Sequence, residues 1–288
     1  MIEFTPTKEF FVGIDSDGCV FDTMELKHKE CFIPNIIMYY NLQGVSKYAR
    51  EAAEFVNLYS KSRGINRFPA LVEALEWLGR RPEVKARGVD CTVPQALREF
   101  VEGESKLGNP ALKKWVEERG GEELTHLLAW SEAVNACIAQ MTHDPVPPFP
   151  WVRESIDKLS QKADQLVISQ TPNAALEHEW EANDLRKYVA GICGQEAGTK
   201  SQTLGQSAKY PEGKSLMIGD APGDYKAAVN NNTLFYPINP GEEEASWKRF
   251  HDEAIDKFFD GTFAGDYQKQ LLDEFESYLP QNPPWPVD

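Results

Sequence analysis

The sequence has few cysteines and no long apolar segment. These two features argue against a disulfide-linked, zinc-binding or membrane-spanning protein. Its five cysteines, Cys19, Cys31, Cys91, Cys137 and Cys193, are widely spaced and include no Cys-x-x-Cys pair. Scattered thiols in odd number are typical of a reduced protein and disfavour a disulfide framework or a zinc site. No stretch approaches the roughly 20 apolar residues that a membrane span requires. We therefore expect a soluble, cytoplasmic protein.

Basic residues are also scarce relative to acidic ones. The chain has 30 Lys and Arg against 45 Asp and Glu, which gives a formal net charge of −15 and a pI of about 4.9. Such a surface repels nucleic acids and anionic lipids, so we expect no nucleic acid and no membrane among its partners. With 288 residues and 41% hydrophobic content, the chain can form one large domain or two smaller ones.

Short apolar runs predict five β-strands separated by helices. The first run spans residues 9–15 and ends in an aspartate, and the later runs cover 165–169, 189–193, 215–219 and 233–236. Helical patterns lie between the later runs, at 173–184, 200–207 and 225–230. Strands that alternate with helices predict an α/β fold with a doubly wound, Rossmann-like parallel sheet.

A different pattern fills the gap between the first and second strands. Apolar residues recur there at helical spacing, as in 70–78, 94–101, 110–118 and 122–140, and a proline-rich stretch at 143–150 indicates a hinge. We therefore predict an α/β core formed by residues 1–24 and 148–288 and an inserted all-helical domain at 25–147. The core includes a helical extension at about 242–279, and the tail from 280 to 288 is expected to be extended.

Two carboxylates follow the first strand, where the ligand site of an open α/β sheet lies. Asp15 and Asp17 are separated by one residue, and Gly18 then permits a sharp turn. Carboxylates at i and i+2 of an extended chain point to the same side and repel each other unless a cation lies between them. Mg²⁺, which prefers oxygen ligands, would satisfy both. The alternative is a loop of solvated acids.

The loop after the second strand has features of an anion site. It reads Ser169-Gln170-Thr171-Pro172, and the Ser169 hydroxyl with the free amides of the turn can surround an anion. Thr171 is expected to cap a helix that begins at Pro172. A plain helix cap is the alternative reading of this loop.

Two further loops complete the set. Lys200 opens the helix after the third strand, Gly219-Asp220 ends the fourth strand, and Asp224 can approach the same place from the first turn of the next helix. Alone, each is compatible with a surface charge or a helix cap. Together the four loops supply a nucleophile, a second carboxylate, a metal site, a hydroxyl and a cation. Phosphoryl transfer needs this combination, because it depends on positioning and on neutralised charge.

The four loops resemble the four motifs of the haloacid dehalogenase-like hydrolase superfamily. Asp15-Ser16-Asp17-Gly18 is similar to its first motif, Ser169 to the second, Lys200 to the third, and Gly219-Asp220 with Asp224 to the fourth. The resemblance covers residues 1–24 and 148–238. Because Asp17 is present, it favours phosphoryl chemistry over dehalogenation. It implies a phosphatase that hydrolyses small phosphate monoesters with Mg²⁺ as its cofactor.

The resemblance also implies a role for each matched residue. Asp15 would form an aspartyl phosphate, and Asp17 would protonate the leaving group and then activate water. Asp15, Asp220 and the backbone carbonyl of Asp17 would hold Mg²⁺, with Asp224 acting directly or through water. Ser169 and Lys200 would bind the phosphoryl oxygens, and we place Gln170 beside them among the substrate-binding residues.

The position of the helical insertion, after the first motif, is similar to that of the cap domain in phosphoglycolate phosphatase-like members. Within it, the basic loop 60–67 contains Arg63, Asn66 and Arg67. We predict that these three side chains bind the polar or anionic end of a small phosphorylated metabolite, because arginine suits carboxylate and phosphate groups. A solvated connector between helices is the alternative.

The same four motifs are also compatible with other functions. A phosphomutase would use the same core and return the phosphate to another hydroxyl. A phosphonate hydrolase would need a Schiff-base lysine, for which Lys27, Lys29, Lys47 and Lys61 are available. A non-catalytic binding protein on this fold is the alternative from another functional class.

Overall fold

The computed structural model describes residues 4–141 and 144–287 and divides into two compact units. The α/β unit comprises residues 4–24 and 145–279, and the helical unit comprises 25–141, 144 and 280–287. We had predicted that the tail after residue 279 belongs to the core, whereas its described residues group with the helical unit. The start of the predicted hinge, at His143, lies outside the described residues.

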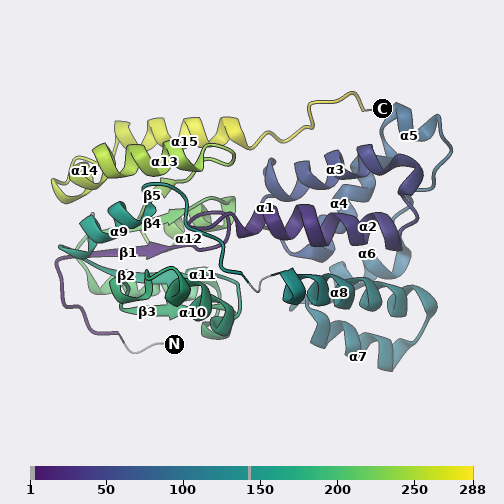
Figure 1. Cartoon of the computed structure of the whole chain (residues 1–288), viewed down its shortest axis with the longest axis horizontal. Helices are drawn as coiled ribbons and strands as arrows, with labels where there is room; N and C mark the ends of the chain where they lie inside the picture. Colours follow the sequence, from purple (N-terminus) through teal and green to yellow (C-terminus); the bar gives the residue numbers. More distant parts are fainter. Residues whose placement is uncertain (1–3, 142–143, 288) are drawn as a thin grey trace. The chain divides into compact units, whose positions relative to one another are not determined.

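A five-stranded parallel sheet forms the centre of the α/β unit (Figure 1). Its strands are β1 (Phe10–Ile14), β2 (Ala163–Ile168), β3 (Gly191–Cys193), β4 (Ser215–Gly219) and β5 (Leu234–Pro237). The strand order is β3-β2-β1-β4-β5, so β1 lies in the middle and pairs with both β2 and β4. The chain continues outward from β1 in both directions, which makes the carboxyl end of β1 the topological switch point where ligands bind in such sheets.

Both faces of the sheet are covered, which explains why its strands are largely apolar. Phe10, Val12 and Ile14 of β1 belong to the hydrophobic cluster on one face, and Phe11 belongs to the cluster on the other. Gly13 allows close packing on that second face, where an added Cβ would lie 2.8 Å from the Ile168 side chain. The predicted doubly wound α/β fold is therefore confirmed.

Helices form the two outer layers of this unit. Those packed on the first face are α9 (Val152–Ser160), α10 (Asn173–Ala182), α13 (Glu243–Arg249) and α14 (Ile255–Phe259). Those packed on the second face are α11 (Lys200–Leu204) and α12 (Pro222–Asn230), whereas α15 (Asp266–Tyr278) contributes Leu271 to the cluster of the first face and Phe275 to that of the second. The C-terminal extension thus adds helices to both faces of the sheet.

The helical unit has a hydrophobic core of its own. Its longer helices are α2 (Ile33–Tyr39), α3 (Ser46–Leu58), α4 (Arg67–Gly79), α6 (Gln95–Gly103), α7 (Asn109–Arg119) and α8 (Glu122–Met141), with short helices α1 (Thr23–Lys27) and α5 (Pro82–Lys85). Phe68 lies at the centre, with its ring 5.0 Å from that of Phe100 and 6.1 Å from that of Trp130. These aromatic contacts tie α4, α6 and α8 together.

The C-terminal tail packs on the helical unit through Trp285. Its ring lies 5.5 Å from that of Phe55 in α3, and the Arg81 guanidinium lies 4.3 Å from its centroid. Arg81 is itself buried, stacks on Tyr48 at 4.7 Å and forms an ion pair with Glu51 at 2.5 Å. The tail is extended, as its prolines predict, but it is anchored by an aromatic side chain.

We expect Trp285→Ala to destabilise the helical unit by about 1–3 kcal/mol, because it removes one aromatic pair and one cation–π contact. Urea unfolding combined with amide hydrogen exchange of α3 measures the effect. Pro286→Ala is the matched control, since Pro286 is an exposed neighbour in the same tail. Equal unfolding midpoints for the two variants would contradict the anchoring role of Trp285.

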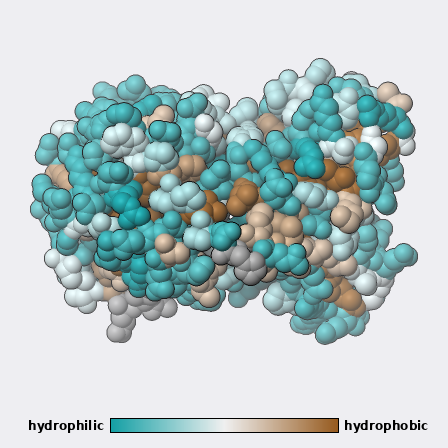
Figure 2. Space-filling view, viewed as in Figure 1, coloured by the Kyte–Doolittle hydropathy of each residue, from teal (hydrophilic) through white to brown (hydrophobic). Residues whose placement is uncertain are grey.

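The face of the molecule drawn in Figure 2 is mostly hydrophilic. Hydrophilic residues predominate over each unit on the face that Figure 2 shows, in agreement with the net charge of −15. Among the described residues, no helix combines the length and the apolarity that crossing a membrane requires.

Candidate active site

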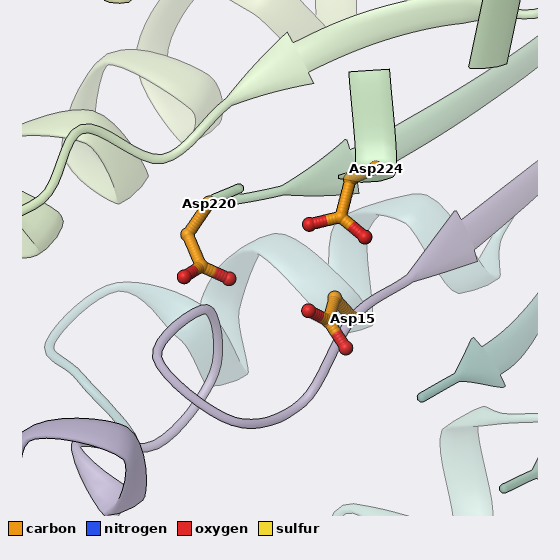
Figure 3. Close-up of side chains that lie close together, drawn as sticks. All are labelled: Asp15, Asp220 and Asp224. Atoms are coloured by element: carbon orange, nitrogen blue, oxygen red, sulfur yellow. The ribbon is translucent and has the colours of Figure 1, made fainter. Parts of the chain in front are cut away.

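Three buried aspartates meet at the carboxyl edge of the sheet. Asp15 follows β1, Asp220 follows β4, and Asp224 lies in the first turn of α12. One carboxylate oxygen from each lies within 4.8 Å of the others, and none of the three residues is more than 4% exposed. Figure 3 shows the three carboxylates gathered around a common space. The parallel topology produces this cluster, because β1 and β4 are neighbours and their carboxyl ends coincide.

Lys200 joins two of these carboxylates. Its ammonium group donates to Asp15 Oδ2 at 2.6 Å and to Asp224 Oδ1 at 2.6 Å. Lys200 begins α11, which Thr199 caps by accepting a hydrogen bond from the Gln202 backbone at 3.2 Å. The cap fixes the start of the helix, and the lysine reaches from there into the carboxylate cluster.

The electrostatics of the cluster reflect an excess of buried negative charge. Burial raises the pKa of Asp15 to about 7, although Lys200 opposes the rise, and the charge of Asp224 adds to it. Burial likewise raises the pKa of Asp224 against the effect of Lys200. For Lys200, burial lowers the pKa, but the ion pairs with Asp15 and Asp224 outweigh it and raise the pKa. One ammonium group thus compensates only part of the charge of three carboxylates.

The donor set fits a divalent cation. Three carboxylates with close oxygens are the hard ligands that Mg²⁺ prefers, and a +2 ion would balance the charge that Lys200 leaves uncompensated. Asp15, Asp220 and Asp224 are therefore the side chains of this structure that could hold the metal.

Gly219 gives Asp224 access to the cluster. A Cβ added at Gly219 would lie 2.4 Å from Asp224 Cβ and 2.6 Å from Asp224 Oδ2. That oxygen also accepts a hydrogen bond from the Ala221 backbone at 3.1 Å, which holds the carboxylate in place. The residue before Asp220 must therefore lack a side chain for Asp224 to occupy its position.

We expect Gly219→Ala to displace the Asp224 carboxylate and to destabilise the fold by about 1–3 kcal/mol, the usual range for overpacking a buried site. Thermal unfolding and Mg²⁺ titration by calorimetry measure the two effects. Gly223→Ala is a matched control, because an added Cβ there meets no atom within 4 Å. Unchanged stability and metal affinity in Gly219→Ala would show that the close approach has no consequence.

The Asp17 side chain lies differently from our expectation. Its carboxylate accepts hydrogen bonds from Thr23 Oγ1 and, at 2.9 Å, from Thr171 Oγ1. It does not belong to the three-carboxylate group. The i, i+2 argument placed Asp15 and Asp17 on one cation, whereas in the structure the hydroxyls of two threonines bind the Asp17 carboxylate. The role of its backbone carbonyl in metal binding stays a prediction.

The loop after β2 lies at the same edge of the sheet. Ser169 is buried, and its hydroxyl accepts a hydrogen bond from the Thr171 backbone at 3.2 Å. The Gln170 amide donates to the Gly198 carbonyl at 3.2 Å, which links this loop to the one before α11. The helix begins at Asn173 with Pro172 as its N-cap, so the predicted cap by Thr171 is replaced by its bond to Asp17.

The three predicted substrate-binding residues of the helical unit all have contacts within that unit. Arg63 is buried and donates to the Leu58 carbonyl at 2.7 Å. Asn66 caps α4 by accepting from the Phe68 backbone at 3.1 Å.

Arg67 bonds to α8 and stacks on an aromatic ring. It donates to Ser131 Oγ at 3.0 Å and to Asn135 Oδ1 at 2.8 Å, and its guanidinium lies 4.9 Å from the Phe32 ring centroid. Burial lowers the pKa of Arg67 to about 10. The structure thus gives Arg63, Asn66 and Arg67 packing contacts, and their predicted contact with a substrate stays a prediction.

Sequence reasoning overlooked the residues that support the first loop. Two buried tryptophans donate indole N–H groups to it: Trp180 to Ser16 Oγ at 3.0 Å and Trp247 to the Cys19 carbonyl at 2.7 Å. Thr23 and Thr171 were likewise not assigned to Asp17. No local signal marks these partners, because most lie more than 150 positions away in the sequence.

Solved structures of similar fold exist, although no protein-family model and no curated protein matches the chain. A candidate phosphoglycolate phosphatase from Lactobacillus delbrueckii subsp. bulgaricus aligns over 90% of this chain and 100% of its own, at 16% identity and a TM-score of 0.53. A phosphatase from Clostridium acetobutylicum, itself assigned by prediction, aligns over 93% and 100%, at 13% identity and a TM-score of 0.42. A haloacid dehalogenase-like family protein from Streptococcus pneumoniae aligns over 85% and 91%, at 14% identity and a TM-score of 0.41.

The likeness to the Lactobacillus protein extends over both units, and it shows that the two chains share the α/β fold described above. At 16% identity the similarity establishes the fold alone. The function must therefore be argued from the site.

Proposed function

We propose that the protein is a Mg²⁺-dependent phosphatase that hydrolyses small phosphate monoesters through an aspartyl phosphate at Asp15. The observation that supports it most strongly is the buried cluster of Asp15, Asp220 and Asp224 with Lys200 between two of them. The cluster lies at the switch point of the sheet, where the fold places ligands. Burying several charged groups together destabilises a fold, and such groups are found mainly at functional sites. A site that binds a metal ion and a phosphoryl group would explain why they are buried here.

Asp15 is the proposed nucleophile. One of its carboxylate oxygens would attack phosphorus, and the bond from phosphorus to the ester oxygen would break. In the structure its Oδ1 accepts the Ser16 backbone N–H at 2.8 Å while Oδ2 accepts from Lys200, so the carboxylate orientation is fixed from both sides. When bound by Asp15, Asp220 and Asp224, Mg²⁺ would neutralise the charge of the phosphoryl oxygens.

Asp17 is the proposed acid and base. It would give a proton to the departing ester oxygen and later remove one from the water that attacks phosphorus, breaking the bond to Asp15 and releasing inorganic phosphate. The two threonine hydroxyls that donate to its carboxylate hold it outside the three-carboxylate cluster, two residues after Asp15 in the chain. This separation suits a group that moves protons, because a metal-bound carboxylate is a weaker base.

Phosphate binding is assigned to Ser169, Gln170 and Lys200. Lys200 pairs with Asp15 and Asp224 of the cluster, and it would pair with a phosphoryl oxygen in place of a carboxylate. We assign the choice among esters to the helical unit, because the residues proposed at the edge of the sheet would all act on the phosphoryl group. Within the helical unit, Arg67 is the candidate to bind an anionic group on the alcohol part of the ester, because Arg67 is only partly buried and can still be reached by a ligand.

A screen of phosphorylated small metabolites and an aryl phosphate, with release of inorganic phosphate as the signal, tests this proposal. We expect turnover of the aryl phosphate and faster turnover of at least one metabolite. A product in which the phosphate has moved to another hydroxyl, without release, would favour a phosphomutase. Trapping by borohydride on Lys27, Lys29, Lys47 or Lys61 would favour a phosphonate hydrolase. Metal binding without turnover of any compound would favour a binding protein.

A further inference from the structure

The loop that presents Asp15 and Asp17 is a compact turn. The carbonyl oxygen of Ser16 accepts the backbone N–H groups of Cys19, Val20 and Phe21 at 3.3, 2.9 and 3.2 Å. Because three backbone N–H groups share one acceptor, the residues of the turn are linked to one another, and a shift of one of them should shift the others.

Cys19 lies in this turn, and its thiol is close enough to the carboxylate cluster for the aspartate charges to act on it. It is fully buried, and burial raises the pKa of its thiol well above the usual value, with further increases from the charges of Asp220, Asp15 and Asp224. Because the Cys19 backbone donates to Ser16, which lies between Asp15 and Asp17, a change in the position of Cys19 acts on the loop that presents both carboxylates.

The C-terminal extension bonds to this residue. Trp247 of α13 is fully buried and donates its indole N–H to the Cys19 carbonyl at 2.7 Å, across 228 positions of sequence. The edge of its ring packs on Phe250, with centroids 5.6 Å apart. The bond satisfies a carbonyl that lies away from water, and removing the N–H would leave that carbonyl without this donor.

We infer that Trp247 is a positioning residue, which holds the loop of Asp15 and Asp17 in its reactive arrangement through the Cys19 carbonyl. The C-terminal extension thereby supports the active site as well as covering the sheet. The kinetic consequence rests on the proposed function, whereas the effect on the loop does not.

The test compares Trp247→Phe with Tyr236→Phe. The first variant keeps an aromatic ring and loses one buried hydrogen bond to the loop. The second loses one buried hydrogen bond from the same aromatic cluster, since the Tyr236 hydroxyl donates to the Ser246 carbonyl at 2.6 Å and its ring lies 4.6 Å from that of Phe250. Tyr236 thus controls for the general cost of a lost buried bond without touching the loop.

For Trp247→Phe we expect kcat on an aryl phosphate to fall about ten-fold, the equivalent of one buried hydrogen bond, with KM changed by less than about two-fold. Amide hydrogen exchange of residues 18–21 should accelerate. Tyr236→Phe should lower the melting temperature by a similar amount and leave kcat and the exchange of residues 18–21 unchanged.

Equal kcat losses in the two variants, or unchanged exchange in Trp247→Phe, would overturn the inference. If the unaltered protein hydrolyses no phosphate ester, the proposed function fails, and the exchange experiment still decides the role of Trp247. Should Trp247→Phe not fold, Phe250→Leu loosens the packing on the indole while keeping its N–H. Phe250→Leu would then be compared with Tyr236→Phe under conditions in which the two variants are equally stable. A larger loss of kcat and a faster amide exchange of residues 18–21 in Phe250→Leu would support the inference. Equal values in the two variants would overturn it.

Discussion

Asp15→Asn should lower kcat by at least about 10³-fold, because the loss of a nucleophile in other hydrolases costs several orders of magnitude. An amide oxygen cannot form the acyl phosphate, although it keeps the shape of the side chain. The fold should survive, since the change removes one of three buried negative charges and the amide oxygen still accepts from either the Ser16 backbone or Lys200. Steady-state kinetics on the aryl phosphate, with circular dichroism as a check of folding, measure the effect.

Asp157→Asn serves as the control for Asp15→Asn. Asp157 is an exposed acid on α9 of the same unit, so its neutralisation should leave kcat within about two-fold of the original, as surface substitutions usually do. A folded Asp15→Asn variant with near-original kcat would show that Asp15 is not the nucleophile.

Chelation of divalent ions should abolish turnover, and Mg²⁺ should restore it. The reason is electrostatic: three buried carboxylates and one ammonium group leave a negative site, and an anionic phosphate ester would be repelled from it without a cation. Kinetics after dialysis against EDTA, followed by Mg²⁺ addition, measure this dependence.

Mg²⁺ should also stabilise the protein in the absence of any substrate. Binding at 100 times the dissociation constant adds about 2.7 kcal/mol to the free energy of unfolding. Asp220→Asn should reduce this gain, whereas Asp157→Asn should preserve it. Full activity after chelation, or a melting temperature that does not respond to Mg²⁺, would count against the metal assignment.

The sheet was predictable because its strands are short apolar runs with chemistry at their carboxyl ends. The run 215–219 coincides with β4, and the run 9–15 contains β1. Since parallel strands bring their carboxyl ends to one edge, the order of the loops was enough to place Asp15 near Asp220. Strand β3 is shorter than expected, because only Gly191–Cys193 pairs with β2.

The details that sequence reasoning missed depend on contacts between distant segments. Asp17 turns to Thr171, 154 positions away, and Trp247 meets Cys19 across 228 positions. The prolines of the tail predicted an extended chain but not its anchor, the contact of Trp285 with the buried Arg81 of the helical unit. Local propensity carries no information about such partners, because they are selected by packing in the folded chain.

The most direct test of the proposed mechanism is to trap the phosphoryl group on Asp15. The protein would be mixed with Mg²⁺ and an excess of its fastest substrate, quenched in acid within the first turnovers and digested for mass spectrometry. We predict that the peptide containing Asp15 gains the mass of one phosphoryl group, and that this adduct is absent from Asp15→Asn and from EDTA-treated protein. Turnover at the normal rate with no adduct on Asp15, or an adduct on a different residue, would contradict the mechanism.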